Sequence, residues 1–527
     1  MRRADRHTIE HVGLPGTVLM ENAGAAVAGV VAERYPRARD IVVLCGRGMN
    51  GGDGFVVTRR LAAVAEALLL GRRDDVAGDA RTHLVACERS QGRVSEVPDA
   101  EAWRAAVRRV EEADLVVDAV LGTGLRAAPT GLAALAITAI RARYDAGRPV
   151  VAVDLPSGIS ADAGALDWPV ARATVTVTFA APKRGHVLPP ACDETGELVI
   201  ADIGIPAASL AAAGPTLFLV EDRDAALAFP RRSRDAHKGE LGHVLVVAGS
   251  LGKTGAAVLA AAGALGSGVG LVTVATPAPC LALVAAARAE LMTEPLAVTG
   301  SGGLDPEGLK HLLALAGGRD AVVLGPGLGQ DASTRELVRA FVRACPVPLV
   351  VDADGLNALV PLGAEAETGL RREAPTILTP HPGEMARLLG RATAEVQRDR
   401  LGAATGLARR TGAIVVLKGQ RTLVAEPNGR ATVVPCGNPG MATGGTGDVL
   451  AGVTGSLLAR HGALLAATAA AFVHGRAGDI AAGRLGEEGM TAGDVAEALP
   501  AAIEGIRGGS PPKAGQHIRG GGPSASS

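Results

Sequence analysis

A glycine-rich segment near residue 50 carries groups that suit ion and phosphate binding. Gly46, Gly48 and Gly51 follow the apolar run 41–44 and satisfy G-x-G-x-x-G, a pattern in which a tight turn brings backbone N–H groups to a phosphate. Asn50 and Asp53 lie in the same segment and add oxygen atoms that suit a hard cation. A plainer alternative is a tight turn in which these two side chains act as helix caps.

Two later segments also place polar side chains directly after apolar runs. Asp118 follows the run 115–117 and precedes Gly122-Thr123-Gly124, whereas Asp154 follows the run 150–153 and precedes Ser157. Either carboxylate could serve only as a helix N-cap. Three such segments after successive runs nevertheless favour one shared site, because ligands bind at the carboxyl ends of strands in open α/β sheets.

The segment 438–452 suits phosphoryl transfer. It reads Asn-Pro-Gly-Met-Ala-Thr-Gly-Gly-Thr-Gly-Asp-Val-Leu-Ala-Gly, so small residues lead into an Ala/Leu-rich helix whose first N–H groups could face an anion. Asp448 in the first turn could take a proton from an attacking hydroxyl. Alternatively, Asp448 only complements the helix dipole, but that role leaves the preceding glycines unexplained.

A second glycine segment, residues 249–254, resembles a P-loop only superficially. The P-loop pattern needs four residues between its two glycines, and only two separate Gly249 from Gly252. We therefore exclude a P-loop.

Apolar runs supply the elements that must position these motifs. Buried strands, separated by Ala-rich helical stretches, are predicted at residues 41–44, 115–117, 150–153, 173–178, 244–248, 321–324, 349–351, 376–378 and 413–417. Such continuous apolar strands are typical of parallel sheets covered on both faces, so the predicted fold class is α/β. The charge-free stretch 254–287 is predicted to form a buried helix, a turn and a strand, because Pro277 and Pro279 interrupt it.

The composition restricts the classes of protein to which the chain can belong. The chain has 527 residues and a formal net charge of −1, with only six Phe, two Tyr and two Trp, which argues against nucleic-acid binding. Its hydrophobic content of 48% is that of a globular protein. The six cysteines are widely spaced and the N-terminus lacks the apolar core of a secretory signal, so we expect a cytoplasmic protein without disulfides. The predicted domains are 1–215 and 222–507, followed by a disordered tail at 508–527.

The first domain resembles the NAD(P)H-hydrate epimerase family. The matching segments are residues 19–24, 46–54, 118–124, 153–158 (Val-Asp-Leu-Pro-Ser-Gly) and 181–185 (Ala-Pro-Lys-Arg-Gly). The resemblance implies a Rossmann-like three-layer α/β/α domain, with K⁺ bound by Asn50, Asp118 and Ser157. It implies substrate contacts from Asn50, Gly51, Gly52, Asp53, Gly122, Thr123, Gly124, Leu125, Arg126 and Asp154, and Asp154 is the candidate acid/base. One departure is Met49, where the family usually has asparagine.

The second domain resembles the ADP-dependent NAD(P)H-hydrate dehydratase family, which has a ribokinase-like fold. The matching segments, besides Gly444–Asp448, are residues 238–250, 325–329, 352–357, 379–384 and 417–419. The resemblance implies that Asp448 is catalytic and that Ala256, Gly327, His381 and Asp448 contact the hydrate. It also implies that ADP and Mg²⁺ bind here, with nucleotide contacts from Lys418, Gly419, Gln420, Arg421, Thr422 and Gly447.

Together the two resemblances imply a bifunctional NAD(P)H-hydrate repair enzyme. The first domain would interconvert the R and S forms of hydrated NADH or NADPH, and the second would dehydrate the S form at the expense of ADP, giving AMP and phosphate. Its partners would be these small molecules and further copies of the chain in a homo-oligomer, with no nucleic acid or membrane. The alternative is a ribokinase-like small-molecule kinase fused to a noncatalytic nucleotide-binding or partner-docking module.

Overall fold

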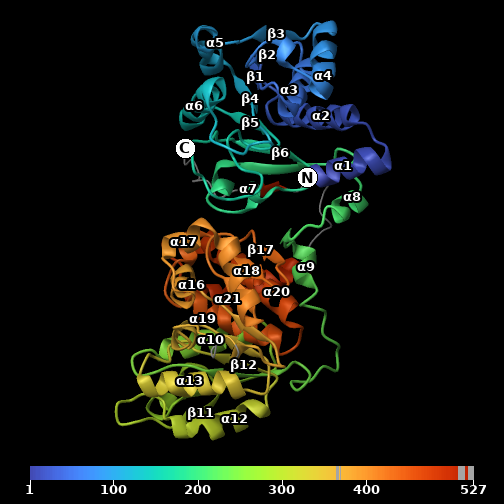
Figure 1. The fold of residues 1–527 in the computed structure, drawn as a ribbon. Coiled ribbons are helices and arrows are strands. Elements are labelled where there is room, and N and C mark those ends of the chain that lie inside the picture. Colours follow the sequence, from blue (N-terminus) through green and yellow to red (C-terminus); the bar gives the residue numbers. More distant parts are fainter. Residues whose placement is uncertain (364–366, 368, 509–516, 520–527) are drawn as a thin grey trace. The chain divides into compact units, whose positions relative to one another are not determined.

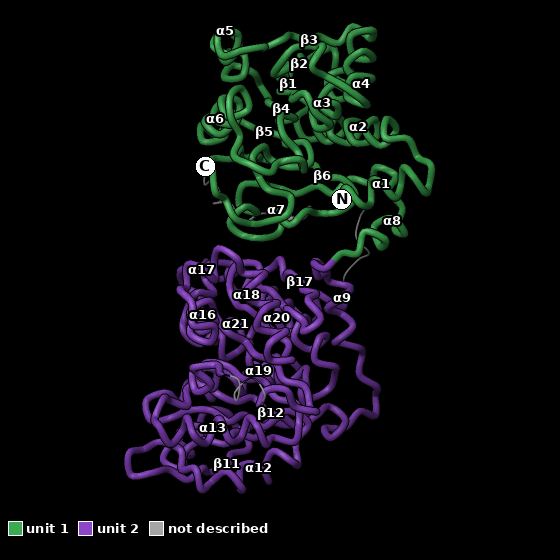
Figure 2. The backbone as a smooth tube through the Cα atoms, in the orientation of Figure 1, with its two compact units in different colours: residues 1–215, 511–527 green, residues 216–510 purple. Residues whose placement is uncertain are grey.

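The chain folds into two compact α/β units in this computed structural model (Figure 1). One unit comprises residues 1–215 with 511–527, and the other comprises residues 216–510 (Figure 2). The structure describes residues 1–363, 367, 369–508 and 517–519. The tail predicted to be disordered, 508–527, therefore lies outside the described residues except for residue 508 and the short strand at 517–519.

The first unit is built on one sheet with the strand order β18-β7-β6-β5-β4-β1-β2-β3. All its neighbouring strands are parallel except β18, which pairs antiparallel with β7. The strands are β1 (Ile41–Cys45), β2 (Ala65–Leu69), β3 (Arg93–Glu96), β4 (Leu115–Ala119), β5 (Val150–Val153), β6 (Val175–Phe179), β7 (Glu197–Ala201) and β18 (His517–Arg519). The parallel sheet predicted from the apolar runs is confirmed.

Helices cover both faces of this sheet. The helices are α1 (Arg2–His7), α2 (Gly16–Arg34), α3 (Met49–Arg60), α4 (Gly78–Arg89), α5 (Ala100–Glu112), α6 (Gly131–Asp145), α7 (Arg184–Val187) and α8 (Ala207–Ala212). A π-helical turn at Thr8–Val12 and 3₁₀ turns at Arg73–Asp75 and Ala191–Glu194 complete the unit. Helices α2, α3 and α4 pack together on one face, and α5 and α6 pack together on the other (Figure 1). The result is the predicted three-layer α/β/α arrangement.

The second unit contains a longer mixed sheet with the strand order β11-β10-β9-β12-β13-β14-β15-β16-β17-β8. The strands are β8 (Leu217–Leu219), β9 (His243–Val247), β10 (Leu271–Pro277), β11 (Met292–Leu296), β12 (Ala321–Leu324), β13 (Leu349–Val351), β14 (Thr376–Leu378), β15 (Ile414–Leu417), β16 (Leu423–Ala425) and β17 (Ala431–Val433). In the order of the sheet, every pair of neighbouring strands from β11 through β10 and β9 to β15 is parallel. Strand β16 is antiparallel to both of its neighbours, β15 and β17.

The helices of the second unit are α9 (Asp222–Ala226), α10 (Thr254–Gly266), α11 (Leu281–Ala287), α12 (Leu309–Gly317), α13 (Ala332–Ala344), α14 (Ala353–Ala358), α16 (Pro382–Leu389), α17 (Thr393–Arg398), α18 (Arg400–Thr411), α19 (Thr446–Leu458), α20 (Ala463–Leu485) and α21 (Ala492–Arg507). In the described part of this unit, 3₁₀ turns lie at Ala278–Cys280, Pro306–Gly308 and Pro439–Met441. Helices α10, α19, α20 and α21 contact one another and share one core with the strands.

The helix, turn and strand predicted for the stretch 254–287 are confirmed, and the stretch contains a second helix that was not predicted. It forms α10, then β10, and then α11 after the proline-containing turn, so the strand precedes the break and a helix follows it. The local sequence explains the strand and the second helix, because Val272, Thr273, Val274 and Thr276 are β-branched, whereas residues 281–287 are Ala and Leu apart from Val284.

The described residues bear on membrane spans and on cysteine pairing. No helix among these residues combines the length and the apolar character needed to cross a membrane. All six cysteines are free, as their spacing predicts.

Helices α10 and α19 approach each other closely at Gly452. A Cβ atom at this position would lie 1.8 Å from the carbonyl oxygen of Ala260, so only glycine fits. Gly447 and Asp448 lie in the first turn of the same helix, so this packing also fixes where that turn sits.

We expect Gly452→Ala to lower the free energy of unfolding by about 1–3 kcal/mol, because the added methyl group forces α10 and α19 apart. The matched control is Gly483→Ala in α20, where an added Cβ meets nothing within 4 Å. This control should gain about 0.5–1 kcal/mol from the better helix propensity of alanine. Urea denaturation of both variants measures the difference, and equal effects would contradict the packing account.

Candidate active sites

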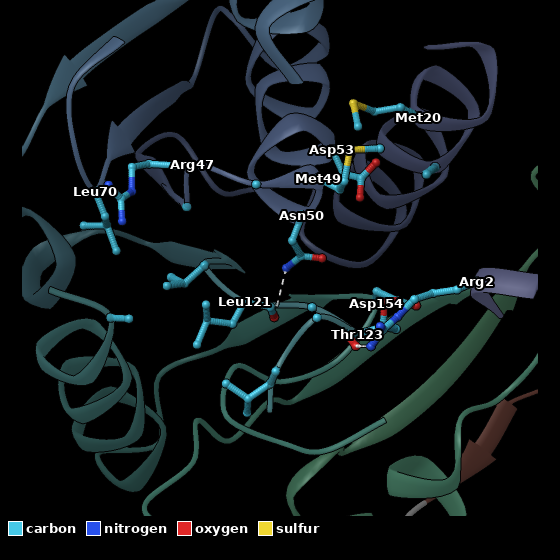
Figure 3. Close-up of a pocket in the computed structure, with 18 of the residues that line it drawn as sticks. Arg2, Met20, Arg47, Met49, Asn50, Asp53, Leu70, Leu121, Thr123 and Asp154 are labelled. Atoms are coloured by element: carbon cyan, nitrogen blue, oxygen red, sulfur yellow. Dashed lines mark hydrogen bonds between the residues drawn. The ribbon is translucent and has the colours of Figure 1, made fainter. Parts of the chain in front are cut away.

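The first unit has a cavity of about 1100 Å³ at the carboxyl ends of its central strands. Predicted site residues that line it are Asn50, Asp53, Gly122, Thr123, Gly124, Leu125, Arg126 and Asp154. Asn50 and Asp53 come from the start of α3, and Thr123 and Asp154 come from the segments after β4 and β5 (Figure 3). The structure therefore brings together the three polar segments that the sequence placed after successive strands.

Gly51 and Gly52 support the cavity without lining it. A Cβ atom at Gly51 would lie 1.8 Å from the carbonyl oxygen of Gly46, and one at Gly52 would lie 2.5 Å from the sulfur of Met20. The glycines therefore let α3 begin tightly against β1 and α2. Met49 is 57% exposed and makes no hydrogen bond to Asn50, Leu121 or Ser157 among the described residues.

Asn50, Asp118 and Ser157 gather around the backbone of Leu121. The Asn50 amide donates to the Leu121 carbonyl at 3.2 Å, and the Ser157 hydroxyl accepts from the Leu121 N–H at 2.9 Å. Ser157 donates to Asp118 through its hydroxyl at 2.5 Å and through its N–H at 2.7 Å. The three side chains expected to bind potassium thus form one oxygen-rich group, the Asp118 cluster.

Asp118 is a fully buried carboxyl group. Burial raises its pKa to about 6, although the hydrogen bonds from Ser157 and Val120 oppose the shift. None of the ion pairs among the described residues involves Asp118. A cation beside this carboxylate would offset its desolvation, and oxygen donors are the ligands that hard cations prefer.

Asp154 forms a buried ion pair with Lys183. Its carboxylate accepts from the Lys183 ammonium and, at 3.0 Å, from the Thr178 hydroxyl. Burial alone would raise the pKa of Asp154, but the Lys183 charge outweighs burial and holds the pKa below its usual value. Asp154 also has a φ of 63°, a left-handed conformation that is strained for a residue with a side chain.

His186 holds the backbone at this strained position. Its Nδ1 accepts from the Lys183 N–H at 3.0 Å, so the proton of the neutral ring must be on Nε2, which donates to the Asp154 carbonyl at 2.8 Å. Burial, together with the Lys183 charge, lowers the pKa of His186 to about 3. The imidazole is therefore a neutral support and not a titrating group near neutral pH.

The pKa of Asp53 is shifted in the opposite direction to that of Asp154. Burial and the nearby charge of Asp154 raise the pKa of Asp53 well above its usual value. Asp53 is 8% exposed, and no side-chain hydrogen bond of its carboxyl group occurs among the described residues. The pKa values of these two carboxyl groups are therefore shifted in opposite directions, so Asp53 holds a proton more tightly than Asp154 does.

In the second unit, Asp448 and Gly447 lie in the first turn of α19. Gly445 precedes the helix with a φ of 96°, which glycine adopts readily. Burial, with the negative charge of Asp352, raises the pKa of Asp448 to about 7, while Lys418 opposes the shift. The carboxyl group can therefore act as a base near neutral pH, as its position in the sequence predicts.

Lys418 follows β15 and joins this turn to two buried acids. Its ammonium lies 2.6 Å from Asp352 and 3.8 Å from Glu384. Burial lowers the pKa of Lys418, but the two carboxylates outweigh this and raise it above its usual value. A Cβ atom at Gly447 would lie 3.2 Å from the same ammonium nitrogen, so glycine allows the lysine to approach α19.

The structure also brings Ala256 and Gly327 together. Gly327 has a φ of 63°, and a Cβ atom there would lie 2.8 Å from the Cβ of Ala256. His381 lies at the start of α16, where its Nδ1 accepts from the Gly383 N–H at 3.0 Å and its Nε2 lies 3.5 Å from Glu384. His381 is thus connected to Lys418 through Glu384.

The remaining predicted nucleotide contacts lie in the turn between β15 and β16. They are Gly419, Gln420, Arg421 and Thr422. Thr422 donates to the Gly419 carbonyl at 2.9 Å, and the Arg421 guanidinium donates to the Pro435 carbonyl at 3.1 Å. Lys418, which directly precedes this turn, contacts the acidic residues Asp352 and Glu384.

Sequence reasoning assigned no role to Lys183, His186, Asp352 or Glu384. Lys183, Asp352 and Glu384 lie inside segments quoted as motifs, and His186 directly follows one of them. Each of the four is at most 6% exposed. The available signal was a charged or imidazole side chain in the segment that follows an apolar strand. Which acid each base would meet depends on strand order, which a single sequence does not specify.

Comparison with known proteins covers both units. Residues 16–185 match the family described as YjeF-related protein N-terminus, and residues 244–501 match the family described as NAD(P)H-hydrate dehydratase. The bifunctional NAD(P)H-hydrate repair enzyme Nnr of Moorella thermoacetica is 43% identical over 85% of both chains. That of Thermofilum pendens is 38% identical over 95% of both chains. A crystal structure of a Bacillus subtilis ADP/ATP-dependent NAD(P)H-hydrate dehydratase is 29% identical with a TM-score of 0.47, covering 55% of this chain and 98% of that chain.

We expect Lys183→Met to lower the free energy of unfolding by about 3–5 kcal/mol at neutral pH, because Asp154 would be left buried without its counter-charge. The lowered pKa of Asp154 adds stability above its ordinary pKa, and this stability is lost as pH falls through the folded-state value. The difference between wild type and variant should therefore shrink in acid.

The matched control is Lys253→Met. Lys253 pairs with Asp354 at 3.4 Å, but its side chain is 56% exposed, so the change should be below about 1 kcal/mol. Urea denaturation at several pH values compares the two variants. A loss at Lys183 no larger than that at Lys253 would show that the buried pair does not stabilise the fold.

Proposed function

Because the chain belongs to the family of bifunctional NAD(P)H-hydrate repair enzymes, we propose that each unit performs one of two successive repair reactions. The first would interconvert the R and S hydrates of NADH and NADPH, and the second would dehydrate the S form with ADP. The observation that carries this proposal is that each unit has its own polar site with a glycine-rich helix start and a carboxyl group of raised pKa.

The hydrated carbon is a hemiaminal, so epimerisation can proceed by ring opening. The hydroxyl loses its proton, the bond from this carbon to the ring nitrogen breaks and the nitrogen takes up a proton, and closure on the other face gives the other epimer. Asp154, ionised by its pairing with Lys183, can accept the proton. Asp53, whose pKa is raised, can donate one from the start of α3. Lys183 and His186 would act by positioning Asp154, while Gly122, Thr123, Gly124, Leu125 and Arg126 would contact the substrate along the cavity.

A potassium ion fits the oxygen-rich Asp118 cluster. Asn50, Asp118 and Ser157 would hold it beside the cavity, as the epimerase resemblance implies. When bound, it would supply a positive charge that compensates the buried carboxylate of Asp118. The cluster's own contribution is to fix the Leu121 backbone, from which the substrate-binding segment 122–126 continues.

Dehydration requires a better leaving group than hydroxide. Asp448 would take the proton from the hydrate hydroxyl as its oxygen attacks the β-phosphorus of ADP, and AMP would leave. The N–H groups at the start of α19 and the Lys418 ammonium would stabilise the negative charge. The ring-nitrogen lone pair would then expel phosphate, and loss of the adjacent ring proton would restore the reduced nicotinamide.

Mg²⁺ would accompany the nucleotide. Among the described residues, no three His, Cys, Asp or Glu side chains are grouped so as to bind a metal. This suits an ion held mainly by phosphate oxygens and water, the usual arrangement for Mg²⁺. Ala256, Gly327 and His381 would contact the hydrate, and Gly419, Gln420, Arg421, Thr422 and Gly447 would contact the nucleotide.

The kinase-and-docking-module alternative is less well supported than two repair activities. The Moorella and Thermofilum relatives extend over both units, so the first unit is not an unrelated attachment to a kinase. A homo-oligomer in the cytoplasm stays a prediction from the sequence.

We expect potassium to stabilise the wild-type protein and to stimulate epimerisation. Asp118→Asn should lose both effects, because the cluster would no longer carry a negative charge. Thermal unfolding in KCl and in choline chloride of equal ionic strength measures the first effect. Epimer-resolved chromatography measures the second.

The control for this experiment is Asp145→Asn, which removes an exposed carboxylate from the end of α6 in the same unit. It should keep the potassium response of the wild type. If Asp118→Asn responds to potassium as strongly as the wild type, the ion does not bind at this cluster.

For dehydration we expect kcat/KM to rise with pH through about 7, because the base form of Asp448 is required and its pKa is about 7. Asp448→Asn should lower the rate by about a hundredfold or more at every pH. Asp352→Asn removes a negative charge that raises this pKa, so its pH profile should move to lower pH. A profile for Asp352→Asn that coincides with the wild type would contradict the electrostatic account.

A further inference from the structure

A second cavity, of about 610 Å³, lies in the second unit away from the site at Asp448. It is lined by the C-terminal ends of α10, α19 and α21 and by the segment that precedes β9. These three helices contact one another, and Asp448 lies at the opposite end of α19 (Figure 1). The 13 residues of α19 span about 20 Å, so the two sites are separate.

Four arginines from different parts of the chain line this cavity: Arg231, Arg232, Arg460 and Arg507. Three of them hold backbone carbonyls. Arg232 donates to Gly268 at 2.6 Å, Arg460 donates to Ser267 at 2.9 Å, and Arg507 donates to Phe229 at 2.8 Å. These contacts neutralise carbonyl groups at the helix ends and fix the guanidinium groups in place.

Not all of the donors are used by these contacts. No hydrogen bond from Arg231, or from Nη1 of Arg232 or Arg460, occurs within the part of the chain that the structure describes. Nor does any carboxylate there lie within ion-pair distance of these three side chains. The cavity therefore has several cationic N–H groups available to a ligand.

Two of these guanidinium groups meet beside Gly268. A Cβ atom at Gly268 would lie 2.7 Å from Nη2 of Arg232 and 3.7 Å from Nη1 of Arg460. Burial, together with the charges of Arg232 and Arg507, lowers the pKa of Arg460 to about 10. Like charges held this closely repel each other unless an anion lies between or beside them.

The acidic residues of the cavity are already engaged. Glu504 pairs with Arg507 at 2.6 Å, Glu240 lies 3.0 Å from His237, and Asp320 accepts from the His243 N–H at 2.7 Å. None of them compensates Arg231, Arg232 or Arg460. The unsatisfied charge of the cavity is therefore positive.

We propose that this cavity is a phosphate-binding site for a small anionic metabolite, with Arg231, Arg232 and Arg460 as the ligands of the phosphate group. Guanidinium groups match phosphate oxygens in charge and geometry. The cavity volume also leaves room for a molecule larger than free phosphate, such as a nucleoside monophosphate.

The test is isothermal titration of the full-length protein with inorganic phosphate at low ionic strength. Arg231→Gln/Arg232→Gln should weaken binding about tenfold or more. Arg231→Gln alone should weaken it measurably, and this variant breaks no hydrogen bond of the described structure. The charge-matched control Arg288→Gln, at an exposed position after α11, should bind as the wild type does.

Two comparisons make the outcome decisive. Equal phosphate affinity in the wild type and the double variant, or an equal loss in Arg288→Gln, would overturn the proposal. Titration with AMP and with adenosine separates free phosphate from a phosphorylated metabolite, because AMP should compete and adenosine should not. Dehydratase turnover measured without added phosphate should be unchanged in Arg231→Gln, since this residue is remote from Asp448.

Discussion

A buried lysine–aspartate ion pair organises each of the two sites. Asp154 directly follows β5 and pairs with Lys183, and Asp352 directly follows β13 and pairs with Lys418. Breaking such a pair leaves an uncompensated charge in a region of low polarity, at a cost of several kcal/mol. Each ion pair therefore depends on the strand order of its sheet, because the lysine and the aspartate follow different strands.

Each pair also sets the protonation of a second carboxyl group at a glycine-rich helix start. Asp154 raises the pKa of Asp53 at the start of α3, and Asp352 raises that of Asp448 at the start of α19. Burial contributes most to both shifts. The same arrangement, a carboxylate fixed by lysine beside a second aspartate, gives the first unit a proton donor and the second a base that titrates near neutral pH.

Sequence reasoning was strongest where a local pattern determines the structure. The β-branched runs predicted β1, β4, β5, β6, β9 and β12 to β15, and the glycines predicted the tight starts of α3 and α19. It missed β2, whose sequence Ala-Glu-Ala-Leu-Leu lacks β-branched residues, and it missed α11, the helix that follows the prolines in 254–287. It also quoted Lys183 and Asp352 within motifs without a role, since their partners lie 29 and 66 residues away and pairing them requires the fold.

The central claim is that the site at Asp154 interconverts the two hydrates while the site at Asp448 dehydrates one of them. Epimer-resolved chromatography of a mixture of R and S NADH hydrate, incubated with K⁺, Mg²⁺ and ADP, tests this claim directly in the variants Asp154→Asn and Asp448→Asn. We predict that Asp154→Asn consumes the S form and leaves the R form to its spontaneous epimerisation, whereas Asp448→Asn equilibrates both forms without producing NADH. Full conversion of the R form by Asp154→Asn at the wild-type rate, or undiminished NADH formation by Asp448→Asn, would contradict the account.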